Sequence, residues 1–338
     1  YKRQEWSRQI NLALYRFGTE AKVMVSSHNW PRWGNERIQQ VMRTQRDAYA
    51  NLNNQVLNLA NQGVTINEIH NEYQVPESLQ QQWSARQYHG SEFHNSRAVL
   101  NRYLGYWDGN PATLAPLSPG DSAPLYVEMM GGAQPILKRA QSLHDAGEYR
   151  LAMEILNKLV YAEPQNQAGK DLLADCFEQL GYQYESASMR NVFLSAAQEL
   201  RNGAPEVGPP RGTNPFLAQA MTTTQWWDAM ATRVDSNLAD EINFVINFSS
   251  PDTGQQFVIE MSGGTLTNIE GYRAQDADAS IVLNRSDLET VIRGEATLAG
   301  QLQAGVGSIK PGNQQVLTQL ASVLVEFDAG FEVMPGTR

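Results

Sequence analysis

The residues of this sequence best suited to metal binding and proton transfer are its histidines. His28 follows a short apolar run at residues 21–25, which predicts a buried strand, and it lies in the loop segment SHNWPRWG at residues 27–34. Pro31 and Gly34 should fix the path of this loop. A neutral imidazole at a strand end offers a nitrogen to a metal ion, and a hydrogen-bonded loop histidine is the simpler interpretation. None of the five histidines belongs to an H-x-H-x-D-H or H-E-x-x-H pattern, so adjacent residues of this sequence do not supply a complete zinc site.

A second group of polar residues surrounds the predicted start of a helix at residues 95–104. His89 and His94 precede or adjoin that start, Asn95 is suited to cap it, and Arg97 falls in its first turn. The N-terminus of a helix carries free N–H donors and a positive dipole end, both of which favour an oxyanion. A solvated helix face remains the plainer interpretation for the arginine.

Aromatic residues follow this helix closely. Tyr103, Tyr106 and Trp107 stand just before the turn-rich segment DGNP at residues 108–111. Packing into a core is the default interpretation of such a group.

The composition excludes several classes of protein. A formal net charge of -10 opposes binding to the nucleic-acid backbone, which needs clustered Lys and Arg. With 41% hydrophobic and 18% charged residues, the chain has the composition of a globular protein rather than a disordered one. Cys176 is the only cysteine, so no intrachain disulfide forms. No apolar run is long enough for a membrane-spanning helix.

The first two thirds of the sequence has mainly helical periodicity. Apolar residues recur at three- and four-residue intervals, which predicts helices at residues 5–17, 35–62, 66–73, 77–87 and 95–104. Gly18 and Gly63 should end the first two. Because Tyr1 is not Met and residues 1–6 already have a helical pattern, we expect the chain to be a fragment of a longer protein.

An internal repeat occupies residues 133–202. Gly147 and Gly181 are 34 residues apart, and Gly147, Tyr149, Ala152 and Pro164 have the spacing of a tetratricopeptide unit. In the second copy Gln183 replaces the tyrosine. The repeat predicts stacked helix pairs, and such helices most often serve packing or association.

A change of fold class is predicted after the repeat. The segment at residues 203–215 is rich in proline and glycine, which is typical of a linker. Beyond it, strands are expected at residues 241–247, 257–261 and 281–283, between helices at residues 224–238 and 314–327. The last helix has more apolar residues than one face needs, so an α+β domain with an apolar groove is expected.

Five segments together resemble the linear alkyl sulfatases of the metallo-β-lactamase superfamily. They are SHNWPRWG at 27–34, QRDAY at 45–49, LANQG at 59–63, HNSRAV at 94–99 and YLGYWDGNP at 103–111. The resemblance extends through the whole chain.

The resemblance implies a multidomain fold. Residues 1–45 would end an α/β metallo-β-lactamase-type catalytic domain, and residues 46–204 would form an all-α dimerisation domain with tetratricopeptide-like helix pairs. A linker at 205–223 would lead to an α+β sterol-carrier-like domain at 224–338. The partners implied are an alkyl sulfate substrate, a second copy in a homodimer, and a catalytic segment upstream of Tyr1. A periplasmic or secreted location is expected.

The resemblance also implies an activity, the hydrolysis of alkyl sulfate esters such as dodecyl sulfate by a site with two zinc ions. His28 matches the last histidine ligand of that site. His94 and Tyr106 match residues near the sulfate group, and we assign them catalytic roles, to donate the proton to the leaving alkoxide or to orient the ester, with His89 as the rival to His94. We assign Arg97, Tyr103 and His89 to substrate binding. A noncatalytic protein with helical repeats and a lipid-binding domain, or a lipid shuttle, is the competing hypothesis.

Overall fold

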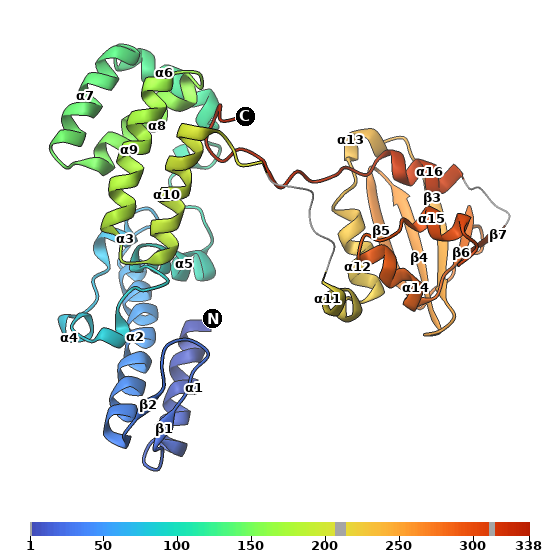
Figure 1. The fold of residues 1–338 in the computed structure, drawn as a ribbon, viewed down its shortest axis with the longest axis horizontal. Coiled ribbons are helices and arrows are strands. Elements are labelled where there is room, and N and C mark those ends of the chain that lie inside the picture. The colour runs from blue at the N-terminus through green and yellow to red at the C-terminus, as the bar shows by residue number, and fades with distance from the viewer. Residues whose placement is uncertain (1, 207–213, 311–314) are drawn as a thin grey trace. The chain divides into compact units, whose positions relative to one another are not determined.

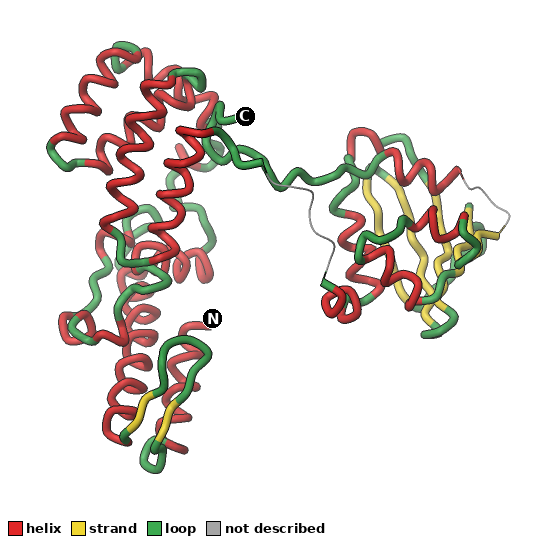
Figure 2. The backbone as a smooth tube through the Cα atoms, viewed as in Figure 1, coloured by secondary structure: helices red, strands yellow, loops and turns green. Residues whose placement is uncertain are grey.

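The computed structural model describes residues 2–206, 214–310 and 315–338, which form two compact units (Figure 1). The helical unit comprises Tyr1–Pro205 and Glu332–Arg338, and the sheet unit comprises Glu206–Phe331. Apart from one short hairpin, the described strands all belong to the sheet unit (Figure 2). No described helix combines the length and apolar character needed to cross a membrane.

The amino-terminal part of the helical unit is a helix pair with a small hairpin. Helix α1 (Lys2–Phe17) packs along α2 (Asn35–Asn61), and the rings of Trp6 and Tyr49 stack between them with centroids 6.2 Å apart. Among the described residues, strands β1 (Val23–Met24) and β2 (Arg32–Trp33) pair only with each other. The helices predicted at 5–17 and 35–62 are therefore confirmed, and Tyr1 lies outside the described residues.

The buried strand predicted at residues 21–25 is wrong. Only two of its residues are extended, and the side chain of Val25 is 73% exposed. Strand burial requires cover from distant elements, and the described residues supply only β2 beside β1. The domain boundary expected at 45/46 stays a prediction, and α2 spans it as one continuous helix of 27 residues.

The middle of the helical unit consists of short helices around the second half of α2. Val56 of α2 is buried with Ile69 and Val99 in one core cluster. The helices predicted at 66–73 and 77–87 form only in part, because turns occupy the rest of those segments. The elements are α3 (Ile69–Glu72), α4 (Glu77–Gln80), η1 (Trp83–Ala85), α5 (Glu92–Leu104) and η2 (Pro111–Thr113).

Helix α5 begins earlier than predicted. Ser91, not Asn95, is its N-cap, because the Ser91 hydroxyl accepts a hydrogen bond from the His94 backbone N–H at 3.3 Å. The Glu92 N–H donates to the side chain of Gln87 at 2.7 Å. Arg97 therefore lies in the second turn, and the first-turn amides of Glu92 and His94 bind oxygens of the chain itself.

Five longer helices complete the helical unit. They are α6 (Pro119–Met129), α7 (Ala133–Asp145), α8 (Tyr149–Ala162), α9 (Gln167–Gln183) and α10 (Ala187–Asn202). Gly147 lies in the turn before α8 with φ 79°, whereas Gly181 is buried within α9, where an added Cβ would lie 2.9 Å from Leu194 Cδ2. The two glycines therefore occupy different positions relative to their helices. The 34-residue register predicted from them does not hold for the second copy, whereas consecutive helices do pack in pairs.

The sheet unit has one five-stranded mixed sheet with the order β5-β4-β3-β6-β7. Strands β3 and β6 are parallel and the other neighbours are antiparallel. The strands predicted at 241–247, 257–261 and 281–283 correspond to β3, β4 and β6, whereas β5 and β7 were missed. The strands are β3 (Phe244–Ser250), β4 (Gln255–Ser262), β5 (Thr265–Glu270), β6 (Ala279–Val282) and β7 (Ser308–Lys310).

Helices cover one face of this sheet. Phe248 and Ile259 alternate with less buried residues along β3 and β4, and both are buried in one core cluster with Trp227 of α12 and Leu288 of α14. The helices are α11 (Pro215–Ala220), α12 (Thr223–Ala231), α13 (Ser236–Ala239), α14 (Arg285–Ile292), α15 (Leu298–Gln303) and α16 (Gln315–Ser322).

Four predictions for this region change. The helix predicted at 224–238 divides into α12 and α13, and the one predicted at 314–327 ends at Ser322, while Gln314 lies outside the described residues. Part of the predicted linker at 205–223 is the helix α11, whose Ala218 is buried in the core, and residues 207–213 lie outside the description. Residues 332–338 belong to the helical unit rather than to the domain predicted at 224–338.

Candidate functional site

The structure gathers positively charged and titratable side chains around Phe93 in the first turn of α5. The centroid of its ring lies 4.1 Å from that of His70 on α3 and 5.4 Å from that of His94. The guanidinium carbon of Arg150, in the first turn of α8, lies 5.7 Å from the same centroid. Arg97 is one helical turn beyond Phe93 on the same face of α5. We call these five residues the α5 cluster.

The electrostatics of the α5 cluster favour an anion. Burial, followed by the charges of Arg97, Arg150 and His94, lowers the pKa of His70 below its usual value. His70 Nδ1 and Arg97 Nε are buried without a hydrogen-bond partner in the described structure. None of the ion pairs among the described residues involves Arg97 or Arg150. An unsatisfied guanidinium N–H of this kind, at Arg97, suits a carboxylate, phosphate or sulfate group.

The lowered pKa of His70 gives a testable pH dependence. The fold favours the neutral imidazole, so the stabilisation is complete above the unfolded pKa, near 6.5, and is lost as the pH falls through the folded pKa. We therefore expect His70→Gln to lose fewer degrees of melting temperature than the parent chain between pH 7.5 and pH 5. Thermal melts over this range check it, with the exposed His28→Gln as the control. Parallel profiles for the parent and His70→Gln would contradict the assignment.

His89 is held at another position, beside the start of α10. Its backbone carbonyl accepts a hydrogen bond from Ser186 Oγ at 2.7 Å, and its Nδ1 lies 3.3 Å from Ser188 Oγ. The structure thus anchors the segment before α5 to the helix pair α9–α10. His89 is not among the residues that surround Phe93.

The two predicted tyrosines lie at the other end of α5. The Tyr103 hydroxyl donates to Asn53 Oδ1 at 3.4 Å, a weak bond to a buried amide of α2. Tyr106 follows Gly105, which ends the helix with φ 86°, and its side chain is 83% exposed. In the described residues, neither a hydrogen bond nor a ring contact joins Tyr106 to the α5 cluster.

His28 is the one predicted metal ligand. It lies in the exposed loop between β1 and β2, next to Asn29, which has the left-handed φ of 68°. Ser26 Oγ donates to the His28 carbonyl, and no hydrogen bond of the imidazole is found among the described residues. No three His, Cys, Asp or Glu residues among those described are grouped closely enough to hold a metal ion. Among the described residues, His28 is therefore an isolated candidate ligand without the further ligands that a metal site needs.

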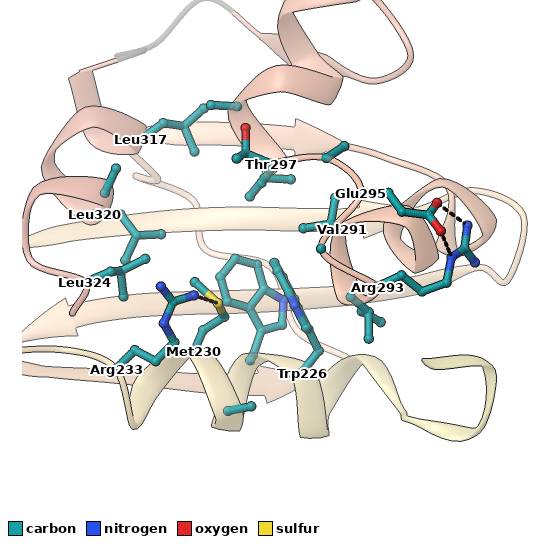
Figure 3. Close-up of a pocket in the computed structure, with 18 of the residues that line it drawn as sticks. Trp226, Met230, Arg233, Val291, Arg293, Glu295, Thr297, Leu317, Leu320 and Leu324 are labelled. Carbon is teal, nitrogen blue, oxygen red and sulfur yellow. Dashed lines mark hydrogen bonds and ion pairs between the residues drawn. The ribbon is translucent and has the colours of Figure 1, made fainter. Parts of the chain in front are cut away.

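The sheet unit contains an open cavity of about 840 Å³ whose lining is mainly apolar and also includes the charged side chains of Arg233, Arg293, Glu295 and Glu326. Trp226 and Met230 of α12 form one wall, and Leu317, Leu320 and Leu324 form the opposite one (Figure 3). At one end of the cavity Arg293 and Glu295 form an ion pair with contacts of 2.8 and 2.9 Å. The apolar surplus at residues 316–327 predicted the leucine wall. The wall from α12 was missed because Trp226 and Met230 also fit an ordinary core helix.

Comparisons with known proteins agree on one family for both units. The family described as alkyl sulfatase dimerisation matches residues 65–203, and that described as alkyl sulfatase C-terminal matches residues 211–336. A linear primary-alkylsulfatase from Pseudomonas sp is 39% identical over 97% of this chain and 49% of its own length. An alkyl/aryl-sulfatase from Saccharomyces cerevisiae is 36% identical over 98% of this chain and 50% of its own length.

A solved structure has the same fold. The stereoselective inverting sec-alkylsulfatase from Pseudomonas sp. superposes with a TM-score of 0.91 at 35% identity, covering 98% of this chain and 52% of that one. The chain thus spans about half the length of the curated relatives that it matches.

Proposed function

Because this chain belongs to the alkyl sulfatase family and carries its dimerisation and C-terminal domains, we propose that the complete protein hydrolyses alkyl sulfate esters, such as dodecyl sulfate, to alcohol and sulfate. The observation that carries this proposal is the identity of 35 to 39% to three alkylsulfatases over nearly the whole chain. The α5 cluster and the apolar cavity add the two chemical features that an anionic ester with a long alkyl tail requires.

In this proposal the α5 cluster binds the sulfate group. Arg97 donates hydrogen bonds to sulfate oxygens through its planar guanidinium, and Arg150 adds a second positive charge from α8. His94 is the group proposed to donate a proton to the oxygen of the departing alcohol. Tyr106, Tyr103 and His89 lie outside the cluster in this chain, and their proposed roles need contacts from the rest of the protein.

The remainder of the catalytic site is proposed to come from outside this chain. Residues 1–45 would end a metallo-β-lactamase-type domain, with His28 as one ligand of a site for two zinc ions. Zinc in such a site supplies a hydroxide nucleophile at neutral pH. The other ligands would come from residues upstream of Tyr1, in keeping with the exposed aromatic side chains Trp6, Trp30 and Trp33.

The other domains are proposed to assemble the protein and to bind its substrate. The helical unit, with tetratricopeptide-like helix pairs, forms a two-fold homodimer. The sheet unit is a sterol-carrier-like domain whose cavity takes the alkyl tail. We also retain a periplasmic or secreted location as a proposal.

One observation favours a second function. The apolar cavity is complete within the sheet unit, whereas the described residues do not complete a metal site. A noncatalytic lipid-binding protein therefore accounts for this chain as well. Metal analysis of the complete protein separates the two, since only the sulfatase requires about two zinc ions per chain.

We expect Arg97→Gln in the complete protein to lower kcat/KM for alkyl sulfates about 10- to 100-fold. The reason is the loss of charge-assisted hydrogen bonds, each worth about 1.5–3 kcal/mol. Ion chromatography of released sulfate measures the effect, and Arg139→Gln, at an exposed position on α7, serves as the control. An unchanged kcat/KM for Arg97→Gln would remove the α5 cluster from the sulfate site.

A further inference from the structure

The carboxy-terminal tail, residues 332–338, follows the sheet unit in sequence but packs on the helical unit. Glu199 of α10 lies beneath the tail with only 8% of its surface exposed. Its Oε1 accepts hydrogen bonds from the backbone N–H groups of Val333 and Met334 at 2.7 and 2.8 Å, and from Thr337 Oγ1 at 2.9 Å. One carboxylate oxygen thus binds three donors of the tail.

A buried lysine donates a hydrogen bond to a backbone carbonyl of the same segment. Lys170 of α9 is 5% exposed, and its Nζ donates to the carbonyl of Gly336. Gly336 has φ 71°, and a Cβ there would collide with the carbonyl of Pro164. The backbone N–H of Ala204 donates to the Thr337 carbonyl at 2.8 Å. Only glycine fits at position 336, so this contact depends on the sequence of the tail.

The tail also has an apolar anchor and an internal turn. Met334 is buried in the core cluster that contains Phe177 and Leu200. Glu332 Oε2 accepts hydrogen bonds from the backbone N–H groups of Thr337 and Arg338 at 3.0 and 3.2 Å, which closes the segment on itself. These contacts present Val333, Met334 and Thr337 to α9 and α10 in one conformation.

The helical unit therefore contains a built site for this peptide. All side-chain hydrogen bonds of Glu199 and Lys170 among the described residues go to the tail. Without the tail, the nearly buried carboxyl group of Glu199 and amino group of Lys170 would have no hydrogen-bond partners. Burying such groups unpaired destabilises the folded state. Buried groups of this kind are expected where a ligand is always or often present.

We propose that the edge formed by α9 and α10 is a peptide-recognition site, occupied in cis by residues 332–338, and that this latch attaches the sheet unit to the helical unit at a second point. The first attachment is the chain that follows α10 and leaves the helical unit at Pro205. A domain that is tethered at two points samples a smaller volume than one that is tethered at a single point. The latch thus restrains the sheet unit, and its release leaves a single tether. The proposal does not depend on catalysis.

The test uses the full chain and a labelled synthetic peptide with the sequence of residues 331–338. Gly336→Val should release the chain's own tail while leaving the site intact. We expect the peptide to bind Gly336→Val at least about tenfold more tightly than it binds the parent chain, measured by fluorescence anisotropy, because the cis tail competes in the parent. A peptide with the same Gly336→Val change should bind neither chain.

Two further variants assign the binding to the site. Adding Glu199→Gln to Gly336→Val should lower the affinity of the chain for the peptide at least about tenfold. Adding Glu128→Gln, at an exposed position on α6, should leave that affinity unchanged. In case Gly336→Val misfolds, Thr337→Val removes one hydrogen bond to Glu199 with little change in shape. It should speed amide exchange at Val333 and Met334 severalfold while the amides within α9 stay protected.

Three results would overturn the proposal. The first is equal peptide affinity for the parent and Gly336→Val chains. The second is exchange of the Val333 and Met334 amides in the parent chain as fast as in the exposed segment before them. The third is protection of these amides that disappears on dilution, which would mean that the tail occupies the site of a second copy.

Discussion

Replacing His28 with alanine in the complete protein is expected to reduce its zinc content and to lower kcat for alkyl sulfate hydrolysis more than about a hundredfold. The imidazole is exposed in the β1–β2 loop, and within the described residues its ring nitrogens have no hydrogen-bond partner. Losing a ligand opens a coordination position that water fills with poorer geometry, and even the loss of an outer-shell partner costs about 10- to 100-fold.

Metal analysis and turnover must be measured on the same preparation. His144→Ala is the matched control, because His144 lies on α7 and, among the described residues, its side chain has its ion pair with Asp145 and its ring contact with Tyr149. It should keep both the zinc and the rate. Unchanged zinc stoichiometry and kcat in His28→Ala would show that His28 is not a ligand.

Filling the cavity of the sheet unit is expected to reduce the preference for long alkyl chains. Each buried methylene contributes about 0.8 kcal/mol, so each added carbon should lower KM up to about fourfold in the parent protein. Leu317→Trp places a larger side chain on a wall of the cavity and should reduce the decrease in KM that each added carbon causes. The loss should appear mainly in KM, because tail contacts are shared by the ground and transition states.

The measurement is kcat/KM for octyl, decyl and dodecyl sulfate. Leu238→Trp is the control, since Leu238 is exposed on α13 and does not line the cavity. A substitution is preferable to deletion of residues 224–338, because that deletion also removes the tail from Glu199. If Leu317→Trp and the parent give parallel chain-length profiles, the cavity does not bind the alkyl tail.

The sequence correctly predicted the elements that depend on residues close together in the chain. The helix expected at 35–62 is α2 almost to the residue, because its apolar periodicity and Gly63, with φ 94°, define its face and its end. The prediction of a buried strand at 21–25 is wrong because the burial of a strand depends on neighbouring elements, which no local sequence pattern encodes. Strand β7 is only three residues long, too short to give a periodic signal.

The candidate site was predictable only where its residues are adjacent in sequence. His94 and Arg97 share one face of α5, so their spacing indicated a common site. His70 and Arg150 come from α3 and α8, and only the tertiary packing around Phe93 brings them together. The contact between Glu199 and Met334 spans 135 residues, and no motif in the sequence suggests it.

The central claim is that the complete protein hydrolyses alkyl sulfate esters, and release of sulfate from dodecyl sulfate tests it most directly. The assay uses the complete protein with its zinc, the same protein after removal of zinc by a chelator, and the chelated protein after zinc is restored. We predict stoichiometric release of sulfate and dodecanol, loss of this activity on chelation and its recovery with zinc. Binding of dodecyl sulfate without any sulfate release by the zinc-loaded protein would contradict the account and favour the lipid-binding alternative.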